Sequence, residues 1–329
     1  MVEKRWPLLA GLLFLVGGCA LSPAVTGSYY LATEKYEAGI VSLQEDFRKN
    51  PENPHVNYYL GRFHLGQDQP RKAIPYLESA ALLDPANSDY HFWLGVAYSQ
   101  NRQPDSERKS YEKALELDDR DYRAWTYLGH NLLEAKRYLK AQEAYTQALL
   151  IKPDLVEARF NRALAMQKLK RTPEEIRAWK DYLRLYPDGS QAREAAVYLN
   201  NLGDFEYRNS LIGHRRVTLR QIEFDPLTGE IARESRPTLD SIGDAIEDRD
   251  DIILHIVGYQ KNNVGLAEKK VKNIKEYLLK KFKSIDFNQI KVSWFNNAER
   301  VRVPGRMVKL PESIHIFSEL KSKPKGGES

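Results

Sequence analysis

The chain has 329 residues, which is long enough for two domains, and 42% of its residues are hydrophobic. The 50 Lys and Arg residues exceed the 45 Asp and Glu residues by only five, and these charges are spread evenly. This balance argues against a nucleic-acid-binding protein, and no RNA- or DNA-binding motif is present. A single cysteine excludes an intramolecular disulfide.

Residues 1–18 have the composition of a secretory signal peptide. Lys4 and Arg5 precede an apolar run from Leu8 to Val16, and small residues follow that run. The apolar run is too short to span a bilayer as a permanent helix. A signal peptide predicts export of the rest of the chain.

The cysteine at the end of this segment indicates a lipid anchor. The run Val16-Gly17-Gly18-Cys19 resembles a bacterial lipobox, in which the cysteine is acylated, for example with palmitate, and becomes the new N-terminus. The resemblance implies membrane anchoring at Cys19. Because alanine (Ala20) and not aspartate follows Cys19, the resemblance further implies that the anchor lies in the outer membrane and that the protein faces the periplasm. We expect residues 19–34 to be a tether. The alternative is a plain signal peptide with an incidental cysteine.

A period of 34 residues runs through the first half of the chain. Pro51, Pro85, Pro153 and Pro187 fall on this period, and Asp119 occupies the remaining position. Three glycines and three alanines repeat with the same spacing: Gly61, Gly95, Gly129, Ala80, Ala114 and Ala148. Such a period is the length of one helix–turn–helix unit of a solenoid, and the small residues let paired helices approach closely.

This pattern resembles the tetratricopeptide repeat. We expect an all-α solenoid over residues 35–204. It comprises a partial repeat at 35–50, four repeats at 54–87, 88–121, 122–155 and 156–189, and a capping helix at 190–202. The fourth repeat departs from the pattern, with Glu175 and Tyr182 where small residues are expected. An ordinary helical bundle with chance spacing is the alternative.

In tetratricopeptide proteins the first helix of each repeat lines a concave groove. The resemblance therefore implies a partner groove formed by Tyr58, Arg62, Leu65, Phe92, Val96, Thr126, His130, Leu133, Phe160 and Leu164. An aromatic and aliphatic floor with a basic edge at Arg62 favours an apolar helix or an extended segment of a partner protein. The alternative is that Phe92 and Phe160 are turned into the core.

The period stops near residue 203, and a second domain is expected over residues 205–318. Alternation and apolar runs predict the order β-α-β-α-β-β, an α/β domain with helices layered on a mixed sheet. The expected elements are strands at 217–224, 252–257, 290–295 and 313–317 and helices at 238–246 and 265–282. Residues 319–329 are expected to form a flexible basic tail.

The second domain resembles the OmpA-like peptidoglycan-binding domain. Phe224-Asp225 matches its opening, and the run from Asn263 to Lys270 stands where the family has Asn-x-x-Leu-Ser-x-x-Arg. The resemblance implies contacts of Lys261, Asn263 and Lys270 with glycan or peptidoglycan. However, Lys261 stands where the family has an aspartate, and Lys270 lacks the planar fork of the family's arginine. We therefore expect a degenerate domain in which the family's binding mechanism is weakened.

No catalytic constellation is evident. The seven histidines show no metal-ligand spacing, and neither a nucleophile-elbow motif nor a phosphate-binding glycine loop is present. We expect no enzyme activity, no cofactor and no bound metal.

These features together predict a lipid-anchored periplasmic scaffold or adaptor for an envelope assembly, with protein partners in the cell envelope. Two alternatives stay open. One is a tether between the outer membrane and peptidoglycan through the OmpA-like domain. The other is an assembly factor for a secretin or a polysaccharide exporter.

Overall fold

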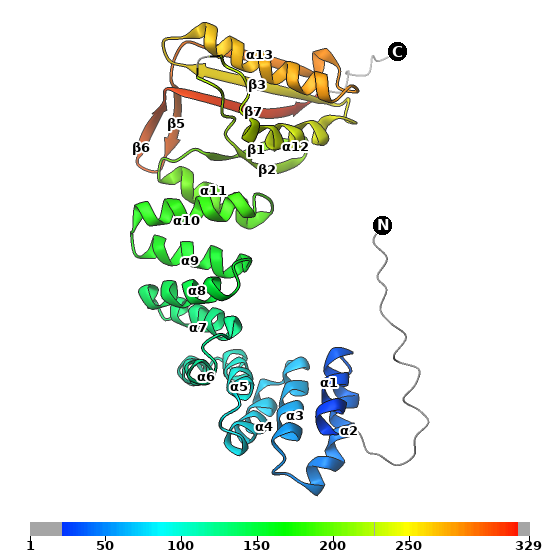
Figure 1. Ribbon diagram of the computed structural model, residues 1–329. Coiled ribbons are helices and arrows are strands. Elements are labelled where there is room, and N and C mark those ends of the chain that lie inside the picture. Colours follow the sequence, from blue (N-terminus) through cyan, green and yellow to red (C-terminus); the bar gives the residue numbers. More distant parts are fainter. Residues whose placement is uncertain (1–21, 227, 322–329) are drawn as a thin grey trace, which may run out of the picture. The chain divides into compact units, whose positions relative to one another are not determined.

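The computed structural model describes residues 22–226 and 228–321. The chain divides into two compact units, with the boundary after Pro153. Helices account for the first unit, whereas the second combines helices with β-strands (Figure 1). Within the described ranges, no helix has the length and apolar character that crossing a bilayer requires.

The first unit is a series of antiparallel helix pairs. Its helices are α1 (Pro23–Ala32), α2 (Tyr36–Lys49), α3 (Pro54–Gly66), α4 (Pro70–Leu83), α5 (Ser88–Gln100), α6 (Pro104–Leu117), α7 (Tyr122–Glu134) and α8 (Tyr138–Ile151). The pairs α3–α4, α5–α6 and α7–α8 coincide with the first three expected repeats. Proline occupies the first helical turn of α3, α4 and α6, where its missing N–H group has no intrahelical partner to lose.

A left-handed residue marks the turn inside every helix pair. Glu34, Asp68, Arg102, Lys136 and Lys170 have φ between 55° and 58°, and each lies 34 positions after the last. Because α1–α2 shares this turn, the pair is a complete helix hairpin. The expected tether over residues 19–34 is therefore corrected: Pro23–Ala32 is a helix that packs on α2 and α3, and the partial repeat is a full pair.

The small residues of the repeats allow close helix contact, as their spacing predicted. A Cβ atom added to Gly95 of α5 would lie 2.5 Å from the ring of Tyr111 on α6. Tyr111 itself is fully buried, and Ala114 on the following turn is also inaccessible. A larger side chain at Gly95 would have to displace a packed aromatic ring, so this column of the repeat sets the spacing of the pair.

The second unit begins with three further helices. They are α9 (Val156–Lys168), α10 (Thr172–Leu185) and α11 (Ser190–Asn201). Trp179 and Tyr182 fill the core of this group, and Tyr207 of the following strand packs into it. The Asn200 side chain also donates to the Tyr207 carbonyl at 2.7 Å. These contacts group α9–α11 with the strands, which differs from the expected boundary after residue 204.

The remainder of the second unit is an α/β arrangement. Its strands are β1 (Tyr207–Ile212), β2 (Arg215–Arg220), β3 (Ile252–Gln260), β4 (Ile290–Phe295), β5 (Glu299–Val303), β6 (Arg306–Leu310) and β7 (Glu312–Leu320). Its helices are α12 (Arg236–Ile246) and α13 (Val264–Lys281), with single 3-10 turns at Arg233–Ser235 and Phe287–Gln289.

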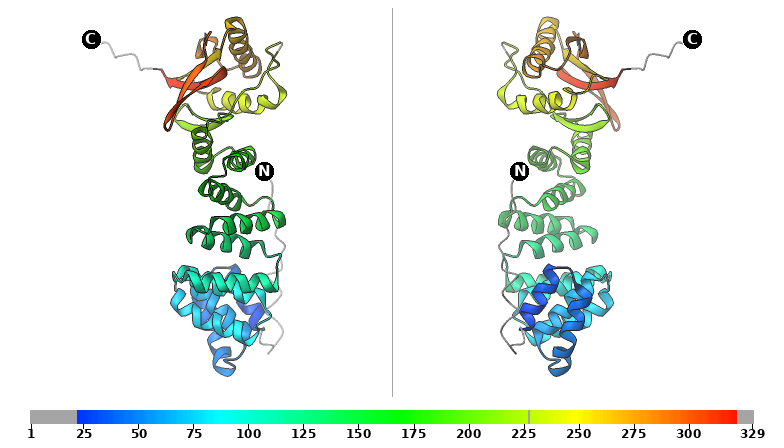
Figure 2. Two further views of the ribbon diagram at one scale, coloured as in Figure 1. Left: turned by 90° about the vertical axis from the view of Figure 1, so that its left-hand side faces the viewer. Right: turned by 90° about the vertical axis from the view of Figure 1, so that its right-hand side faces the viewer.

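A three-stranded sheet in the order β4-β3-β7 forms the centre of this region. β3 pairs in parallel with β4 and antiparallel with β7. Leu254 and Ile256 of β3 alternate with more exposed residues and pack against Val271 and Ile274 of α13. Both α12 and α13 lie on the same side of the sheet (Figure 2). One face of the sheet therefore carries the core.

The expected order β-α-β-α-β-β is correct for six elements but omits three strands. β1 forms a hairpin with β2 around a turn in which Gly213 has φ +61°, and β5 pairs with β6 around Gly305, which has φ +77°. Polar residues interrupt the alternation in β1 and β6, and β5 has only five residues, so the sequence signal of these three strands is weak. The expected basic tail is also shortened, because β7 continues to Leu320.

Candidate protein-binding face of the repeats

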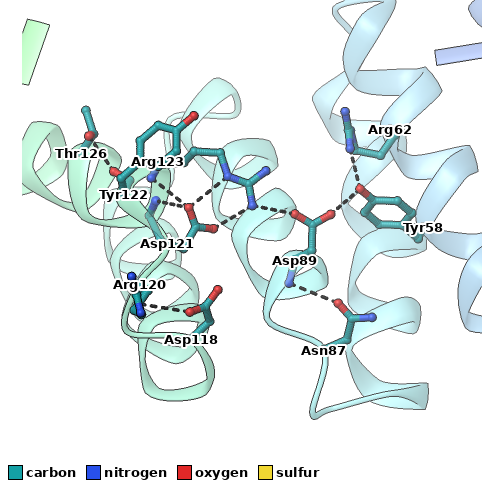
Figure 3. Close-up of polar contacts among 11 residues, drawn as sticks. Tyr58, Arg62, Asn87, Asp89, Asp118, Arg120, Asp121, Tyr122, Arg123 and Thr126 are labelled. Atoms are coloured by element: carbon teal, nitrogen blue, oxygen red, sulfur yellow. Dashed lines mark hydrogen bonds and ion pairs between the residues drawn. The ribbon is translucent and has the colours of Figure 1, made fainter. Parts of the chain in front are cut away.

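The first helices of three successive repeats, α3, α5 and α7, are joined by polar contacts (Figure 3). The Tyr58 hydroxyl donates to Asp89 Oδ2 at 2.5 Å and accepts a hydrogen bond from Arg62 Nη1 at 2.5 Å. Asp89 Oδ1 pairs with Arg123 Nη2 at 2.9 Å, and Arg123 also binds Asp121 Oδ2 at 2.7 Å. One continuous network therefore links three repeats of the first unit.

Arg62 is stacked on an aromatic ring. Its guanidinium carbon lies 3.3 Å from the ring centroid of Trp93 on α5 and 5.4 Å from that of Tyr58. The side chain is partly exposed, and among the described residues it forms no ion pair with a carboxylate. We call Tyr58, Arg62, Asp89, Trp93 and Arg123 the arginine–aromatic face.

Arg123 occupies the other end of this face. Its guanidinium carbon lies 4.5 Å above the ring of Phe92. Asp121 caps the N-terminus of α7 by accepting from the Arg123 backbone N–H at 2.9 Å, which fixes its carboxylate beside the guanidinium. The hydrogen bonds that Arg123 donates to the Asp121 carboxylate raise the pKa of Arg123, while burial raises the pKa of the Tyr58 hydroxyl. The arginine therefore stays charged and the hydroxyl stays protonated.

Several residues predicted to line the groove are buried in the repeats. Phe92 is 2% exposed and packs against Tyr111, and Thr126 is 7% exposed with its hydroxyl donating to the Tyr122 carbonyl. Tyr58, Leu65 and Val96 are also buried. The prediction that Phe92 forms an open floor is corrected: its ring supports Arg123 from beneath and fills the space between helices. A role of these residues in partner binding stays a prediction.

Three predicted groove residues of the first unit are partly accessible. These are Arg62, His130 and Leu133. The His130 ring lies between the rings of Tyr127 at 5.7 Å and Tyr145 at 5.6 Å. Tyr127, which the sequence did not single out, is 40% exposed.

In the second unit, Phe160 of α9 is turned into the core. It is 5% exposed, and its ring lies 5.1 Å from Trp179 and 5.3 Å from Tyr182. Leu164 packs partly buried against the same cluster. The prediction of an open aromatic site at Phe160 is thus also corrected, because two large rings of α10 occupy the space beside it.

The residues that the sequence analysis missed, Asp89, Trp93 and Arg123, lie at one fixed spacing from residues that it predicted. Tyr58 with Asp89 and Arg62 with Trp93 are each 31 positions apart, as are Phe92 and Arg123. This offset is one repeat minus one helical turn. The Asp89–Arg123 ion pair joins residues 34 apart, in the same column of neighbouring repeats. Opposite charges at the same position of neighbouring repeats could therefore have predicted this ion pair from the sequence.

Two of the three residues predicted to contact peptidoglycan, Lys270 and Asn263, have internal roles, whereas a contact of the exposed Lys261 side chain stays a prediction. Lys270 is 2% exposed, its ammonium donates to Gln260 Oε1 at 2.9 Å, and it forms an ion pair with Glu312. Asn263 caps α13 by accepting from the Leu266 N–H at 3.0 Å, and Lys261 is exposed with its backbone N–H bound to the Pro311 carbonyl. The expectation that Lys270 offers its charge to a ligand is corrected, because the domain supplies its partners.

Two further expectations concern lipid and metal. Cys19 lies outside the described residues. Among the residues that are described, no group of three or more His, Cys, Asp or Glu side chains is arranged to hold a metal ion.

Comparison with protein families identifies the repeats. Residues 60–122 and 126–190 match the tetratricopeptide repeat family model. The repeats of this chain are therefore tetratricopeptide repeats, a class of structure that typically serves as a protein-binding scaffold.

Curated relatives share part of this region. The type IV pilus assembly protein PilF of Pseudomonas aeruginosa is 31% identical over 102 residues, which are 31% of this chain and 38% of PilF. A peroxisomal targeting signal receptor of Kluyveromyces lactis is 29% identical over 110 residues, which are 33% of this chain and 19% of the receptor. The chain thus spans well under half the length of these relatives.

A solved structure from a functional characterisation of Pseudomonas aeruginosa PilF shows the same fold. It is 14% identical with a TM-score of 0.50 and covers 68% of this chain and 89% of its own chain.

Proposed function

We propose that this chain is a lipid-anchored periplasmic scaffold that binds a protein partner of an envelope assembly through the arginine–aromatic face. Its tetratricopeptide repeats support a role in protein binding. The similarity to a protein named for type IV pilus assembly supports the link to envelope assembly.

The observation that carries this proposal is the state of Arg62. Its guanidinium carbon lies 3.3 Å from the centre of the Trp93 ring, and no carboxylate in the described part of the chain forms an ion pair with it. A stacked, partly desolvated arginine is a strong site for a carboxylate, because its fixed planar donors lose little freedom on binding. The Trp93 and Tyr127 rings, which both contact the Phe92 ring, provide apolar surface on α5 and α7. We therefore infer a partner segment that combines an acidic residue with apolar side chains.

In-cell photocrosslinking tests this proposal. A photoreactive amino acid at Tyr127, which is 40% exposed, should capture a partner that mass spectrometry then identifies. The Arg62→Glu variant should lower the yield of that product by at least about tenfold, because a like charge opposes the partner's carboxylate. Arg71→Glu, on the exposed side of α4, is the matched control and should leave the yield unchanged. Equal loss in both variants would contradict the role of this face.

The identity of the captured protein also separates the alternatives. A secretin or a polysaccharide exporter would assign the chain to assembly of that machine. A cytoplasmic protein would contradict the envelope location altogether.

Anchoring at the periplasmic face of the outer membrane is proposed from the sequence around Cys19. Lys4, Arg5 and the apolar run before the cysteine support it. A Cys19→Ser variant should lose labelling by radioactive palmitate and move from the membrane fraction to the soluble fraction. Label retained by the variant would contradict acylation at this residue.

The C-terminal region is proposed to be an OmpA-like domain that no longer binds the cell wall by the family's mechanism. The parallel β3–β4 pair, the antiparallel β7 and the helices on one side of the sheet support the resemblance. The ion pair of Lys270 with Glu312 supports the loss of ligand binding. Purified sacculi should not retain the protein. Retention that Lys270→Ala abolishes would favour the tether alternative.

A further inference from the structure

The second unit contains a cleft beside β2 that none of these roles uses. Its volume is about 700 Å³, within the range typical of ligand-binding pockets. Residues of β2 form one wall and residues of α12 the other. The cleft is also lined by Tyr207 and Ile212 of β1, by the turn residues Gly213 and His214, and by Pro187 and Asp188. β2 and α12 lie side by side in Figure 1.

The backbone of β2 presents hydrogen-bonding groups to this cleft. The Gln221 N–H donates to the Glu206 carbonyl at 2.7 Å, which makes Glu206–Gln221 a hydrogen-bonded pair of the β1–β2 ladder. Hydrogen-bonded and non-hydrogen-bonded pairs alternate along an antiparallel ladder. In the observed register, Arg220 and Thr218 then belong to non-hydrogen-bonded pairs. Their N–H and C=O groups point away from β1.

The outer edge of β1 is occupied by other parts of the second unit. The Tyr207 carbonyl accepts from the Asn200 side chain at 2.7 Å, and the Leu211 carbonyl accepts from Ser318 Oγ at 3.4 Å. The neighbouring Gly213 N–H also donates to Ser318 Oγ at 2.7 Å. This edge of the hairpin is therefore covered by α11 and β7.

The outer edge of β2 is not covered in the same way. The Arg216 carbonyl accepts from Arg193 Nη1 at 3.4 Å. Within the described part of the chain, the outward N–H and C=O groups of Thr218 and Arg220 have no such partner. An unpaired strand edge of this kind is a template for one more strand, because only another extended backbone matches its alternating donors and acceptors.

The walls of the cleft have room for an extended chain. Val217 and Leu219 of β2 supply apolar surface, and both pack only partly against the core. Across the cleft, α12 presents the small exposed side chains of Ser241 and Ala245, one helical turn apart. Small side chains let a strand approach the helix while it remains about 4.8 Å from β2.

The charges in the cleft restrict the ligand further. Arg220 is paired with Glu206, and Arg249 is paired with Asp251. Arg215, at the start of β2, is exposed and forms no ion pair among the described residues. Because Asp188 and Asp244 also line the cleft, only the end of β2 at Arg215 favours a carboxylate of the ligand.

We propose that β2 and α12 form a β-augmentation site for an extended segment of a partner protein. The segment adds a strand to the free edge of β2, places alternate apolar side chains between Val217 and Ala245, and directs one carboxylate to Arg215. This site is separate from the arginine–aromatic face, so its failure would leave the scaffold proposal unaffected.

Titration of the whole protein with a defined peptide tests the proposal. The probe is the peptide Glu-Val-Thr-Val-Thr-Val, acetylated at its N-terminus and amidated at its C-terminus. Calorimetry measures its binding to the protein, and NMR measures amide exchange in the protein. We expect saturable binding that slows exchange at Thr218 and Arg220. N-methylation of alternate residues removes the donors along one edge of the peptide. One of the two alternate methylation patterns should weaken binding roughly tenfold, because it removes the hydrogen bonds to β2. The other pattern should leave binding intact.

Two protein variants complete the test. Ala245→Glu fills the cleft from an exposed helical position, and Arg215→Glu reverses the free charge; each should abolish binding. Lys280→Glu, exposed on α13, is the matched control and should bind normally. No binding at millimolar peptide, or equal binding of both methylated peptides, would overturn the proposal. Sedimentation that shows a dimer lost in Ala245→Glu would overturn it too, because a second copy of this chain would then be the occupant.

Discussion

Arg62 in the repeats and Lys270 in the C-terminal region differ in what the protein supplies to each cation. Arg62 is partly exposed, stacked on Trp93, and without a carboxylate among the described residues. Lys270 is almost fully buried and forms an ion pair with Glu312. We propose that the first side chain binds a partner, whereas the second holds the domain together. The groups around a cationic side chain therefore determine whether it can bind a partner or instead stabilises the fold.

The largest expected effect follows from removing Lys270. The Lys270→Ala variant leaves Glu312 without its partner and opens a gap beneath Phe224, whose ring lies 5.3 Å from the ammonium. Breaking a buried pair costs about 3–5 kcal/mol, and because the Glu312 side chain is 47% exposed we expect about 2–3 kcal/mol.

Amide exchange in β3, compared with α5, measures this loss. The β3 amides should exchange faster while those of α5 are unchanged. Lys270→Met, which keeps the packing volume, should lose less than half as much. Unchanged β3 exchange in Lys270→Ala would mean that the ion pair contributes nothing, and Lys270 would again be a candidate for ligand binding.

Two helix caps give a second, smaller comparison. Asp121 accepts backbone N–H groups of α7 and also binds the Arg123 side chain, whereas Asn263 caps α13 through the Leu266 N–H. Loss of a cap costs typically about 1 kcal/mol, and loss of the ion pair adds to it. Asp121→Ala should therefore destabilise the repeats by about 1–2 kcal/mol and Asn263→Ala the C-terminal region by about 1 kcal/mol. Urea unfolding followed by circular dichroism tests this order, and equal losses would contradict it.

The repeats could be predicted in detail because their packing is periodic. A glycine such as Gly95 recurs where a ring must fit, so one column of sequence reports one contact. The turn residues were missed, because Asp68, Arg102 and Lys136 adopt left-handed backbone without being glycine. The first helix, Pro23–Ala32, was missed because it precedes the first proline of the period.

The site was predicted less well than the fold. Helical spacing places a residue such as Phe92 on a helix face, but whether the ring meets solvent depends on neighbours that come 31 positions later, such as Arg123. In the C-terminal region, the sequence pattern predicted a helix at Lys270, and this residue lies on α13. Its partner Glu312 lies on strand β7, which is distant in the sequence, and no local sequence pattern predicts that ion pair.

Two half-buried histidines, His64 and His315, allow the pH dependence of stability to be compared between the two regions. Burial and the nearby Arg208 lower the pKa of His315 in the C-terminal region, and burial lowers the pKa of His64 in the repeats. At pH values between the lowered pKa and the ordinary pKa of 6.5, the folded state therefore binds fewer protons than the unfolded state. Stability should be full above that window and fall as the pH falls through it. We expect a smaller loss than either cap produces.

Thermal unfolding between pH 7.5 and 5.0 measures this dependence. His315→Gln should flatten the pH profile of the C-terminal region, and His64→Gln should flatten that of the repeats. A profile that both variants leave unchanged would show that other groups govern the acid response.

The smallest expected effect on stability is that of Arg62→Lys. Lysine keeps the charge but loses the flat contact with Trp93, so we expect a loss below about 1 kcal/mol, as for an exposed cation–π pair. Partner capture at Tyr127 should nevertheless fall severalfold, since an ammonium cannot bind a carboxylate with two parallel hydrogen bonds. Measuring both the crosslink yield and the melting temperature of this variant separates the effect on partner capture from the effect on stability. If Arg62→Lys captures as well as the unmodified protein, charge alone attracts the partner. If it unfolds as readily as Lys270→Ala, Arg62 is a structural residue and the difference between the two cations disappears.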